Sequence, residues 1–102
     1  MASESCAFDL VGAEFIRDVK PGEMLVFEDD YAEPKSMMWS KEMPSKCAHC
    51  IFEYVYFART DSVIDKQCVY QARINMGREL AKETKEIHPD IVISVPDSGT
   101  AA

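Results

Sequence analysis

The stretch that decides the fold is Val69-Tyr-Gln-Ala-Arg-Ile-Asn-Met-Gly-Arg-Glu-Leu80. Four of its apolar residues recur at steps of three, four and four positions, and these are Val69, Ala72, Met76 and Leu80. Because an α-helix turns once every ~3.6 residues, this spacing places all four on one face of a helix. Gly77 costs about 1 kcal/mol relative to alanine inside such a helix, so we expect another segment to pack closely against it.

Both ends of this helix carry signals. Ser62-Val-Ile-Asp65, or Asp65 alone, can cap its start, because side-chain oxygens accept hydrogen bonds from the first free N–H groups. Lys82 and Lys85 suit the negative C-terminal end of the helix dipole. His88-Pro89 then stops the helix, since proline has no N–H to donate.

Two apolar runs flank the predicted helix and are typical of strands. Ile51-Phe-Glu-Tyr-Val-Tyr-Phe57 is rich in the residues that sheets favour. Asp90-Ile-Val-Ile-Ser-Val95 shows little alternation, which is typical of a parallel strand covered on both faces. Such a strand needs neighbouring strands and covering helices, and only one helix is predicted. We therefore expect a sequence that is cut in the middle of a fold.

The first third of the chain is predicted to be β-structure. Residues 6–11 and 15–19 are short runs with apolar residues spaced as in strands. Lys20-Pro-Gly-Glu23 predicts a type II turn, because proline presets φ at its second position and glycine supplies the positive φ at its third. Residues 24–27 then return as a strand, which makes a β-hairpin. Residues 28–48 contain two prolines and are predicted to form a connecting loop.

The composition restricts the class of protein. The chain has 102 residues, about the size of one small domain, and its 47% hydrophobic content is ordinary for a globular protein. Its formal charge of −7 disfavours nucleic acids and anionic membranes as partners. No window holds about 18 uninterrupted apolar residues, and the first residues do not resemble a signal peptide. We therefore expect a cytoplasmic protein that binds neither nucleic acid nor membrane.

Four cysteines are present, at positions 6, 47, 50 and 68. Without a secretory signal we expect reduced thiols, which are either buried or bound to metal. Cys47-Ala-His-Cys50 has the spacing at which two thiolates chelate one metal from a tight loop. A full site needs about four ligands, and no second pair is present, so we expect at most a partial site completed elsewhere. Cys6 is predicted to be a core thiol.

Val95-Pro-Asp-Ser-Gly-Thr100 is the first candidate for ligand binding. It follows the carboxyl end of a predicted strand, where ligands of open α/β sheets sit. Ser98 can offer a hydroxyl and Asp97 a carboxylate to Mg²⁺, while Gly99 lets a phosphate approach the backbone. The same residue types also form ordinary turns, so a plain strand-ending turn stays open at this point.

The remaining polar residues form no catalytic arrangement. Only two histidines are present, and His88 reads as a helix-end residue. Arg59 and Asp61 are predicted to pair across a turn, as a surface ion pair that contributes about 0–1 kcal/mol. We therefore assign no catalytic residue to this chain.

Four blocks of the sequence resemble the amidophosphoribosyltransferase family. In the family's order they are Ala2-Ser-Glu-Ser-Cys-Ala-Phe-Asp-Leu-Val-Gly-Ala-Glu-Phe-Ile-Arg-Asp-Val-Lys-Pro-Gly-Glu23, Cys50-Ile-Phe-Glu-Tyr-Val-Tyr-Phe-Ala-Arg59, Val69-Tyr-Gln-Ala-Arg73 and Val95-Pro-Asp-Ser-Gly-Thr100. Together they cover most of the chain outside residues 28–46. The block that ends at Arg59 is highly specific for the family.

The resemblance implies an enzyme that makes 5-phosphoribosylamine from phosphoribosylpyrophosphate and glutamine, the first step of de novo purine (IMP) biosynthesis. A glutaminase domain with an N-terminal cysteine nucleophile (Ntn type) frees ammonia, which displaces diphosphate in a phosphoribosyltransferase domain. By resemblance, residues 1–60 are the end of the glutaminase β-sheet domain. Residues 61–102 are the first helix and strand of the α/β transferase domain. The fold class is then an α+β fragment, and the full-length protein is expected to be a homo-oligomer.

Two residues carry family roles by resemblance. Ser98 matches the serine that helps to hold Mg²⁺ near the substrate's phosphates. Cys50 matches the first ligand of a [4Fe–4S] cluster that part of the family carries, and this role applies only if the parent protein has a cluster. The other cluster ligands would lie beyond this chain. Cys47 is outside the family pattern, and Thr60 stands where proline is usual.

Both family active sites are incomplete in this sequence. It has no processed N-terminal cysteine, and it lacks the acidic phosphoribosylpyrophosphate loop, Asp-Asp-Ser followed by Arg-Gly-Thr. We therefore expect an internal fragment that is inactive alone and poorly folded in isolation. The alternatives are a small cysteine-based metal-binding module, which would bind stoichiometric metal, and an interaction module, which would fold as a monomer or a defined oligomer.

Overall fold

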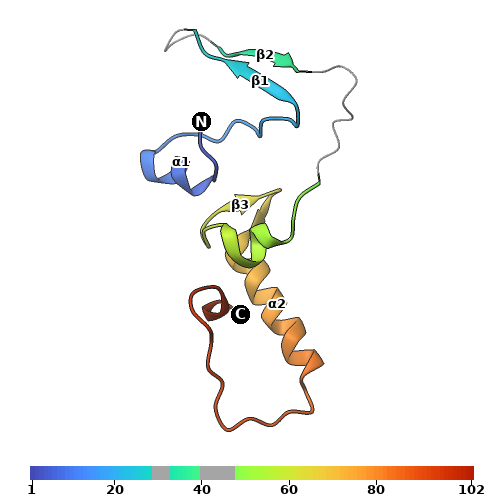
Figure 1. Cartoon of the computed structure of the whole chain (residues 1–102). Helices are drawn as coiled ribbons and strands as arrows, with labels where there is room; N and C mark the ends of the chain where they lie inside the picture. Colours follow the sequence, from blue (N-terminus) through green and yellow to red (C-terminus); the bar gives the residue numbers. More distant parts are fainter. Residues whose placement is uncertain (29–32, 40–47) are drawn as a thin grey trace. The chain divides into compact units, whose positions relative to one another are not determined.

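The computed structural model describes residues 1–28, 33–39 and 48–102. Its elements, in chain order, are α1 (Cys6–Val11), β1 (Glu23–Val26), β2 (Lys35–Met38), η1 (Glu53–Phe57), β3 (Val63–Ile64), β4 (Gln67–Cys68), α2 (Val69–Glu83) and η2 (Ser98–Thr100) (Figure 1). Here η1 is a π-helix and η2 a 3-10 helix. The chain divides into two compact units, residues 16–49 and residues 1–15 with 50–102. The mixture of helices and strands agrees with the predicted α+β class.

The unit of residues 16–49 contains a two-stranded antiparallel hairpin (Figure 1). β1 pairs with β2 in a register that places Glu23 opposite Met38. The predicted turn before β1 is confirmed, because the Glu23 N–H donates to the Lys20 carbonyl at 2.9 Å and Gly22 has a φ of 75°. An L-residue adopts such a φ only under strain, so the turn requires glycine at this position.

The partner of β1 differs from the prediction. Residues 15–19 form no strand, and β1 pairs instead with β2, which lies inside the predicted loop of residues 28–48. All four residues of β2 are exposed, and its sequence, Lys-Ser-Met-Met, lacks the alternation of apolar and polar residues that identifies a strand. The rest of that predicted loop includes residues 29–32 and 40–47, which lie outside the described residues, and Cys47 is among them.

Residues 6–11 form the helix α1 and not the predicted strand. Cys6 is buried, as expected for a core thiol. Phe8 packs against Phe15 with ring centroids 6.1 Å apart. Gly12 ends the helix in the left-handed conformation, with a φ of 66°. This local termination and the aromatic contact favour the helix over the alternating pattern of the sequence.

Residues 51–57 also form a helical turn where a strand is predicted. The N–H of Ala58 donates to the Glu53 carbonyl at 2.9 Å, which closes the π-helix η1. The reason lies in α2, whose Arg73 guanidinium binds the carbonyls of Tyr54 and Tyr56, which a sheet would need for its ladder. Strand propensity depends on context, and here the contact with a buried cation outweighs it.

The predicted helix is present as α2, but it begins later and ends earlier than expected. Where Ser62 or Asp65 is predicted to cap it, β3 and β4 form a tight antiparallel hairpin. Asp65 and Lys66 form the turn of this hairpin, and both have positive φ, as is usual for two-residue turns that connect antiparallel strands. The helix therefore begins only at Val69. It ends at Glu83, before the predicted histidine–proline stop.

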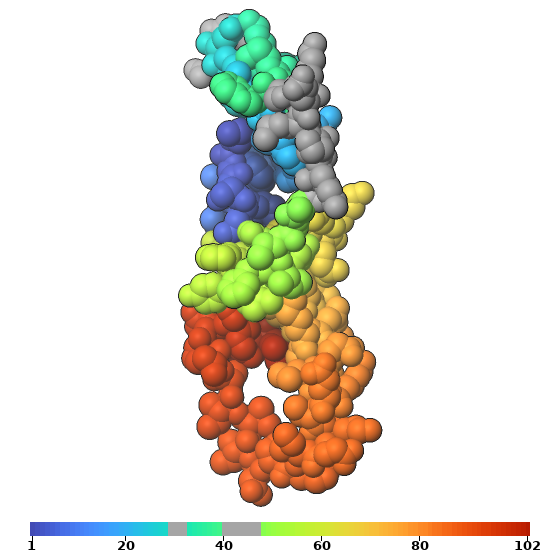
Figure 2. Space-filling view, turned by 45° about the vertical axis from the view of Figure 1, so that its right-hand side comes forward, coloured from blue at the N-terminus to red at the C-terminus, as the bar shows by residue number. Residues whose placement is uncertain are grey.

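Residues 91–95 form no strand, contrary to the prediction. Four apolar side chains of this segment are between 75% and 84% exposed, namely Ile91, Val92, Ile93 and Val95. A strand that is apolar on both faces needs a neighbour on each side, and the described residues provide none. In Figure 2 the orange-red part of the chain, which includes residues 91–95, is separated from α2 by a visible gap before the chain returns to the helix.

The core of the unit of residues 1–15 and 50–102 is small. Its buried residues are Cys6, Ala58, Ser62, Val69 and Arg73. Close packing at Gly77 is confirmed, because a Cβ at this position would overlap the backbone of Ala102. Within the described part of the chain, no helix combines the length and the apolar character that crossing a membrane requires.

Candidate functional site

Ser98 lies at the edge of a cavity of about 590 Å³. Three segments line it, namely residues 56–60, Arg73 of α2 and residues 96–98. Ser98 begins η2 and is half-buried. The structure therefore brings the residue predicted to bind Mg²⁺ together with two arginines, Arg59 and Arg73.

Arg73 is the buried cation of this cavity, with only 5% of the residue exposed. Its Nε donates to the Tyr54 carbonyl at 2.8 Å. Its Nη2 donates to the carbonyls of Ala58 at 2.9 Å and Tyr56 at 3.4 Å. A charged group is seldom buried without compensation, and here three carbonyl dipoles compensate the guanidinium. Arg73 is thus a fixed positive wall of the cavity.

Arg59 forms the predicted ion pair with Asp61, with 2.9 Å between Nη2 and Oδ2. Both side chains are more than half exposed, so the pair contributes only about 0–1 kcal/mol to stability. The hydrogen bond to Asp61 is the main cause that raises the pKa of Arg59 above its ordinary value. Arg59 therefore adds a second permanent positive charge to the lining.

A carboxylate from the start of the chain reaches the same stretch. Glu4 Oε2 accepts hydrogen bonds from the Arg59 backbone N–H and from the Ser62 hydroxyl, both at 2.8 Å. The neighbouring Ser5 Oγ accepts from the Val63 N–H at 2.7 Å. The hydrogen bond from the Arg59 backbone is the largest cause that lowers the pKa of Glu4, and burial partly opposes it. Glu4 is consequently held as a carboxylate near neutral pH.

The contacts of Arg73 and Glu4 were not predicted from the sequence. Arg73 lies four positions after the fully buried Val69 and thus on the same face of α2. A charged residue on a buried face is the signal that could have identified it. Glu4 offers no comparable signal, because its partners lie 55 and 58 positions further along the chain.

Cys50 is exposed, and its carbonyl accepts a hydrogen bond from the Glu53 N–H at 3.1 Å. Cys6 and Cys68 are free thiols, buried and half-buried respectively. Within residues 1–28, 33–39 and 48–102, no three His, Cys, Asp or Glu side chains come together as a metal site. An iron–sulfur cluster of the Cys₄ type needs four thiolates. The described residues therefore do not complete a cluster site at Cys50.

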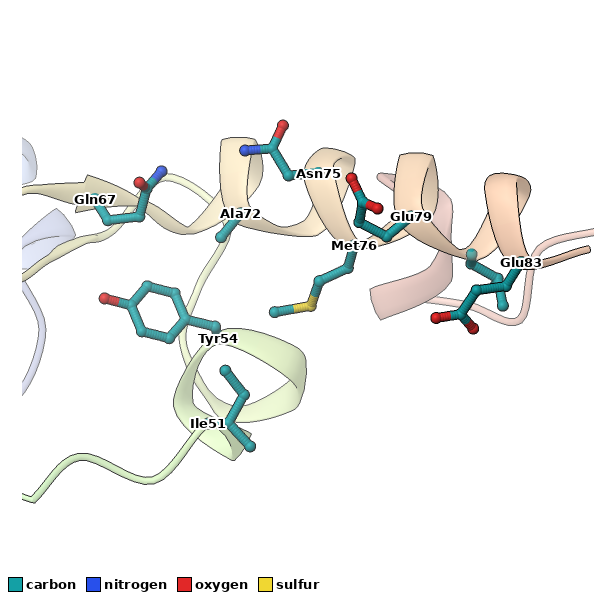
Figure 3. Close-up of a pocket in the computed structure, with 9 residues that line it drawn as sticks. Ile51, Tyr54, Gln67, Ala72, Asn75, Met76, Glu79 and Glu83 are labelled. Atoms are coloured by element: carbon teal, nitrogen blue, oxygen red, sulfur yellow. The ribbon is translucent and has the colours of Figure 1, made fainter.

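A second hollow is a mostly apolar groove of about 550 Å³. Figure 3 shows the Met76 side chain extending from α2 toward Ile51 and Tyr54. The Tyr54 hydroxyl donates to the Ile64 carbonyl at 2.9 Å, and burial is the first cause that raises the pKa of Tyr54. The apolar lining suits packing of another segment better than it suits chemistry on a polar substrate.

The cavity at Ser98 has the character of a binding site for an anion with an associated cation. Arg59 supplies a guanidinium group of the kind that binds phosphate and carboxylate groups well, while the guanidinium of Arg73 is occupied by backbone carbonyls. Ser98 and Asp97 supply the oxygen donors that Mg²⁺ prefers. This lining suits the binding of an anionic ligand.

Comparison with known proteins identifies relatives over the whole chain. No protein-family model matches it. An amidophosphoribosyltransferase of Archaeoglobus fulgidus is 48% identical over 102 residues, which is 100% of this chain and 21% of that protein.

Solved structures give the same result. The structure of an allosteric regulatory enzyme of purine biosynthesis matches 97% of this chain and 20% of its own, with 45% identity and a TM-score of 0.81. The glutamine phosphoribosylpyrophosphate amidotransferase of Bacillus subtilis, complexed with ADP and GMP, matches 97% of this chain and 21% of its own, with 45% identity and a TM-score of 0.80. The chain spans about a fifth of the length of these relatives. The resemblance inferred from the four sequence blocks is thus confirmed, and this chain is similar over its whole length to one segment of the amidophosphoribosyltransferases.

Proposed function

We propose that this chain is a segment of an amidophosphoribosyltransferase, which makes 5-phosphoribosylamine from phosphoribosylpyrophosphate and glutamine at the start of de novo purine biosynthesis. The observation that carries the proposal is 48% identity over the entire chain to an enzyme of that name. The TM-scores of 0.80 and 0.81 to solved enzymes support it. The complete protein acts in the cytoplasm as a homo-oligomer.

Within that enzyme, residues 1–60 are the end of the glutaminase domain, and residues 61–102 are the beginning of the phosphoribosyltransferase domain. Residues 91–95 then become a strand of the transferase sheet, since further strands of the complete protein cover them on both sides. Their present exposure supports this assignment, because exposed apolar side chains gain stability when they are removed from water.

Ser98 takes part in holding the Mg²⁺ that accompanies phosphoribosylpyrophosphate. Ser98 is half-buried at the start of η2, and Asp97, which directly precedes it, belongs to the same lining. These oxygen donors fit Mg²⁺, which is commonly bound through a few protein ligands together with substrate phosphates. When bound, the ion neutralises the charge that develops on the departing diphosphate. The chain's own contribution is the loop of residues 96–98, together with the nearby positive charge of Arg59 for the phosphates.

Cys50 is a ligand of a [4Fe–4S] cluster only if the complete protein carries one. The exposure of its thiol supports the assignment, because a ligand must be free to meet thiolates from other segments. The alternative is a small free-standing metal-binding module. Among the described side chains, no group of three or more His, Cys, Asp or Glu supports it. The chain alone contains neither complete active site and is inactive in isolation.

The coding sequence on both sides of this chain tests the proposal. We expect an upstream region that encodes an N-terminal cysteine after the initiator methionine or after a propeptide. We also expect a downstream Asp-Asp-Ser loop, with or without the later cysteines of a cluster. A start and a stop codon that directly enclose the 102 residues would contradict the proposal and require a direct metal assay.

A further inference from the structure

The stretch of residues 54–63, which we call the junction segment, is bound through its backbone from two directions. On one side the Arg73 guanidinium donates to the carbonyls of Tyr54, Tyr56 and Ala58. All of these residues belong to one compact unit, residues 1–15 with 50–102. Tyr54 and Tyr56 lie within η1, and Ala58 directly follows it.

From the other direction, Glu4 and Ser5 accept hydrogen bonds from groups of the same segment. Glu4 Oε2 accepts from the Arg59 N–H and the Ser62 hydroxyl, and Ser5 Oγ accepts from the Val63 N–H. The donor–acceptor distances are 2.7 to 2.8 Å. Ser62 is completely buried. Its hydroxyl therefore depends on the Glu4 carboxylate, because water does not reach it.

The chemistry of the two sets of contacts is complementary. A carboxylate can only accept and a guanidinium can only donate, so Glu4 binds N–H and O–H groups while Arg73 binds carbonyls. Hydrogen bonds to a charged partner are about twice as strong as those between neutral groups. The backbone of the junction segment is thus fixed by an acid and a base that lie 69 positions apart in the sequence.

The junction segment also forms a wall of the cavity at Ser98. Residues 56–60 and Arg73 line that cavity together with residues 96–98. The junction segment therefore links a wall of the cavity at Ser98 to Glu4 and Ser5. Under the domain assignment proposed above, Glu4 and Ser5 belong to the glutaminase part and Arg73 to the transferase part, with the boundary inside the segment.

We infer that Glu4, Ser5 and Arg73 are positioning residues that couple the glutaminase part to the transferase site through the junction segment. None of them touches a reacting atom in this inference. They fix the position of the wall of the transferase cavity relative to the glutaminase part, so that ammonia freed from glutamine reaches the phosphoribosyl group. Ammonia supplied from solution reaches the transferase site without the glutaminase part, so its reaction does not depend on that relative position. The inference rests on the proposed function.

The test uses the product of the full reading frame and compares two nitrogen sources, glutamine and added ammonium. Glu4→Gln, Ser5→Ala and Arg73→Lys are assayed for formation of phosphoribosylamine with each source. We expect the ratio of the glutamine-driven rate to the ammonia-driven rate to fall about tenfold for Glu4→Gln and Arg73→Lys, the scale of one lost charge-assisted hydrogen bond. Ser5→Ala, which loses one neutral hydrogen bond and so folds most readily, lowers the ratio severalfold.

Glu14→Gln is the matched control, because it removes the same charge from an exposed carboxylate outside these contacts. We expect its ratio of glutamine-driven to ammonia-driven rate to equal that of the unmodified protein. Rates that fall by equal factors with both nitrogen sources, or that do not change, overturn the inference while the proposed function stands. An unmodified protein that is inactive with both sources overturns the proposed function, and the inference with it.

Discussion

At the scale of single residues, one carboxylate organises the hairpin of residues 16–49. Glu23 accepts hydrogen bonds from both terminal nitrogens of Arg17, at 2.7 and 2.8 Å, and from the Lys20 N–H at 2.8 Å. It also accepts from the Ser36 hydroxyl at 2.5 Å, which joins the turn to β2. The same side chain thus holds the approach to the turn, the turn itself and the partner strand.

These contacts predict that the hairpin weakens in acid. The hydrogen bond from Arg17 is the largest cause that lowers the pKa of Glu23, followed by those from Ser36 and Lys20. Because the folded-state pKa is depressed, the stabilisation is fully present above the unfolded pKa and is lost as the pH falls through the folded pKa. An NMR titration of the Glu23 carboxyl carbon measures this midpoint, and Glu23→Gln removes the acid dependence. A midpoint near the ordinary value of 4.5 would argue against the contacts.

Ser98 leads to a second prediction at this scale. In the complete enzyme, Ser98→Ala raises the Mg²⁺ concentration required for half-maximal synthesis of phosphoribosylamine by about tenfold, the scale of losing one contact around a bound metal. The measurement is a Mg²⁺ titration of the ammonia-driven rate, which leaves glutaminase chemistry out. Ser3→Ala, an exposed serine outside the lining of the cavity, serves as the control. Equal Mg²⁺ requirements in both variants would exclude Ser98 from the metal site.

At the scale of elements, two local patterns predicted the structure correctly. The 3.6-residue period identified α2, and a proline–glycine pair identified the turn at Gly22. The strand predicted for residues 51–57 is wrong because Arg73 binds the carbonyls of Tyr54 and Tyr56 from another element. Likewise, the sequence singled out Ser98 but could not place Glu4 beside Ser62, since a contact over 58 positions leaves no periodic trace.

Gly77 provides a prediction about α2. Gly77→Ala favours the helix by about 1 kcal/mol through propensity alone. The added Cβ overlaps the backbone of Ala102, which is not the tip of a flexible side chain, so that contact must open. We expect unchanged or higher helix content by circular dichroism, together with greater mobility of residues 101–102 in NMR relaxation. Unaltered relaxation at these residues would show that the close contact does not form.

At the scale of the whole molecule, the exposure of apolar side chains predicts weak cooperativity. Only three apolar residues are buried among those that the structure describes, namely Cys6, Ala58 and Val69. Such a core cannot offset the entropy of ordering about a hundred residues. Heating the isolated 102-residue chain should therefore give a broad calorimetric trace without a sharp transition. A sharp, reversible transition would contradict this prediction and favour a free-standing module.

The reaction itself tests most directly whether this chain is a segment of an amidophosphoribosyltransferase. The product of the full reading frame is mixed with phosphoribosylpyrophosphate, glutamine and Mg²⁺, and the release of diphosphate is followed. We predict release that requires glutamine or ammonia, with phosphoribosylamine formed in equal amount, while the 102-residue chain alone releases none. Absence of diphosphate release from the complete protein with both nitrogen sources would contradict the claim.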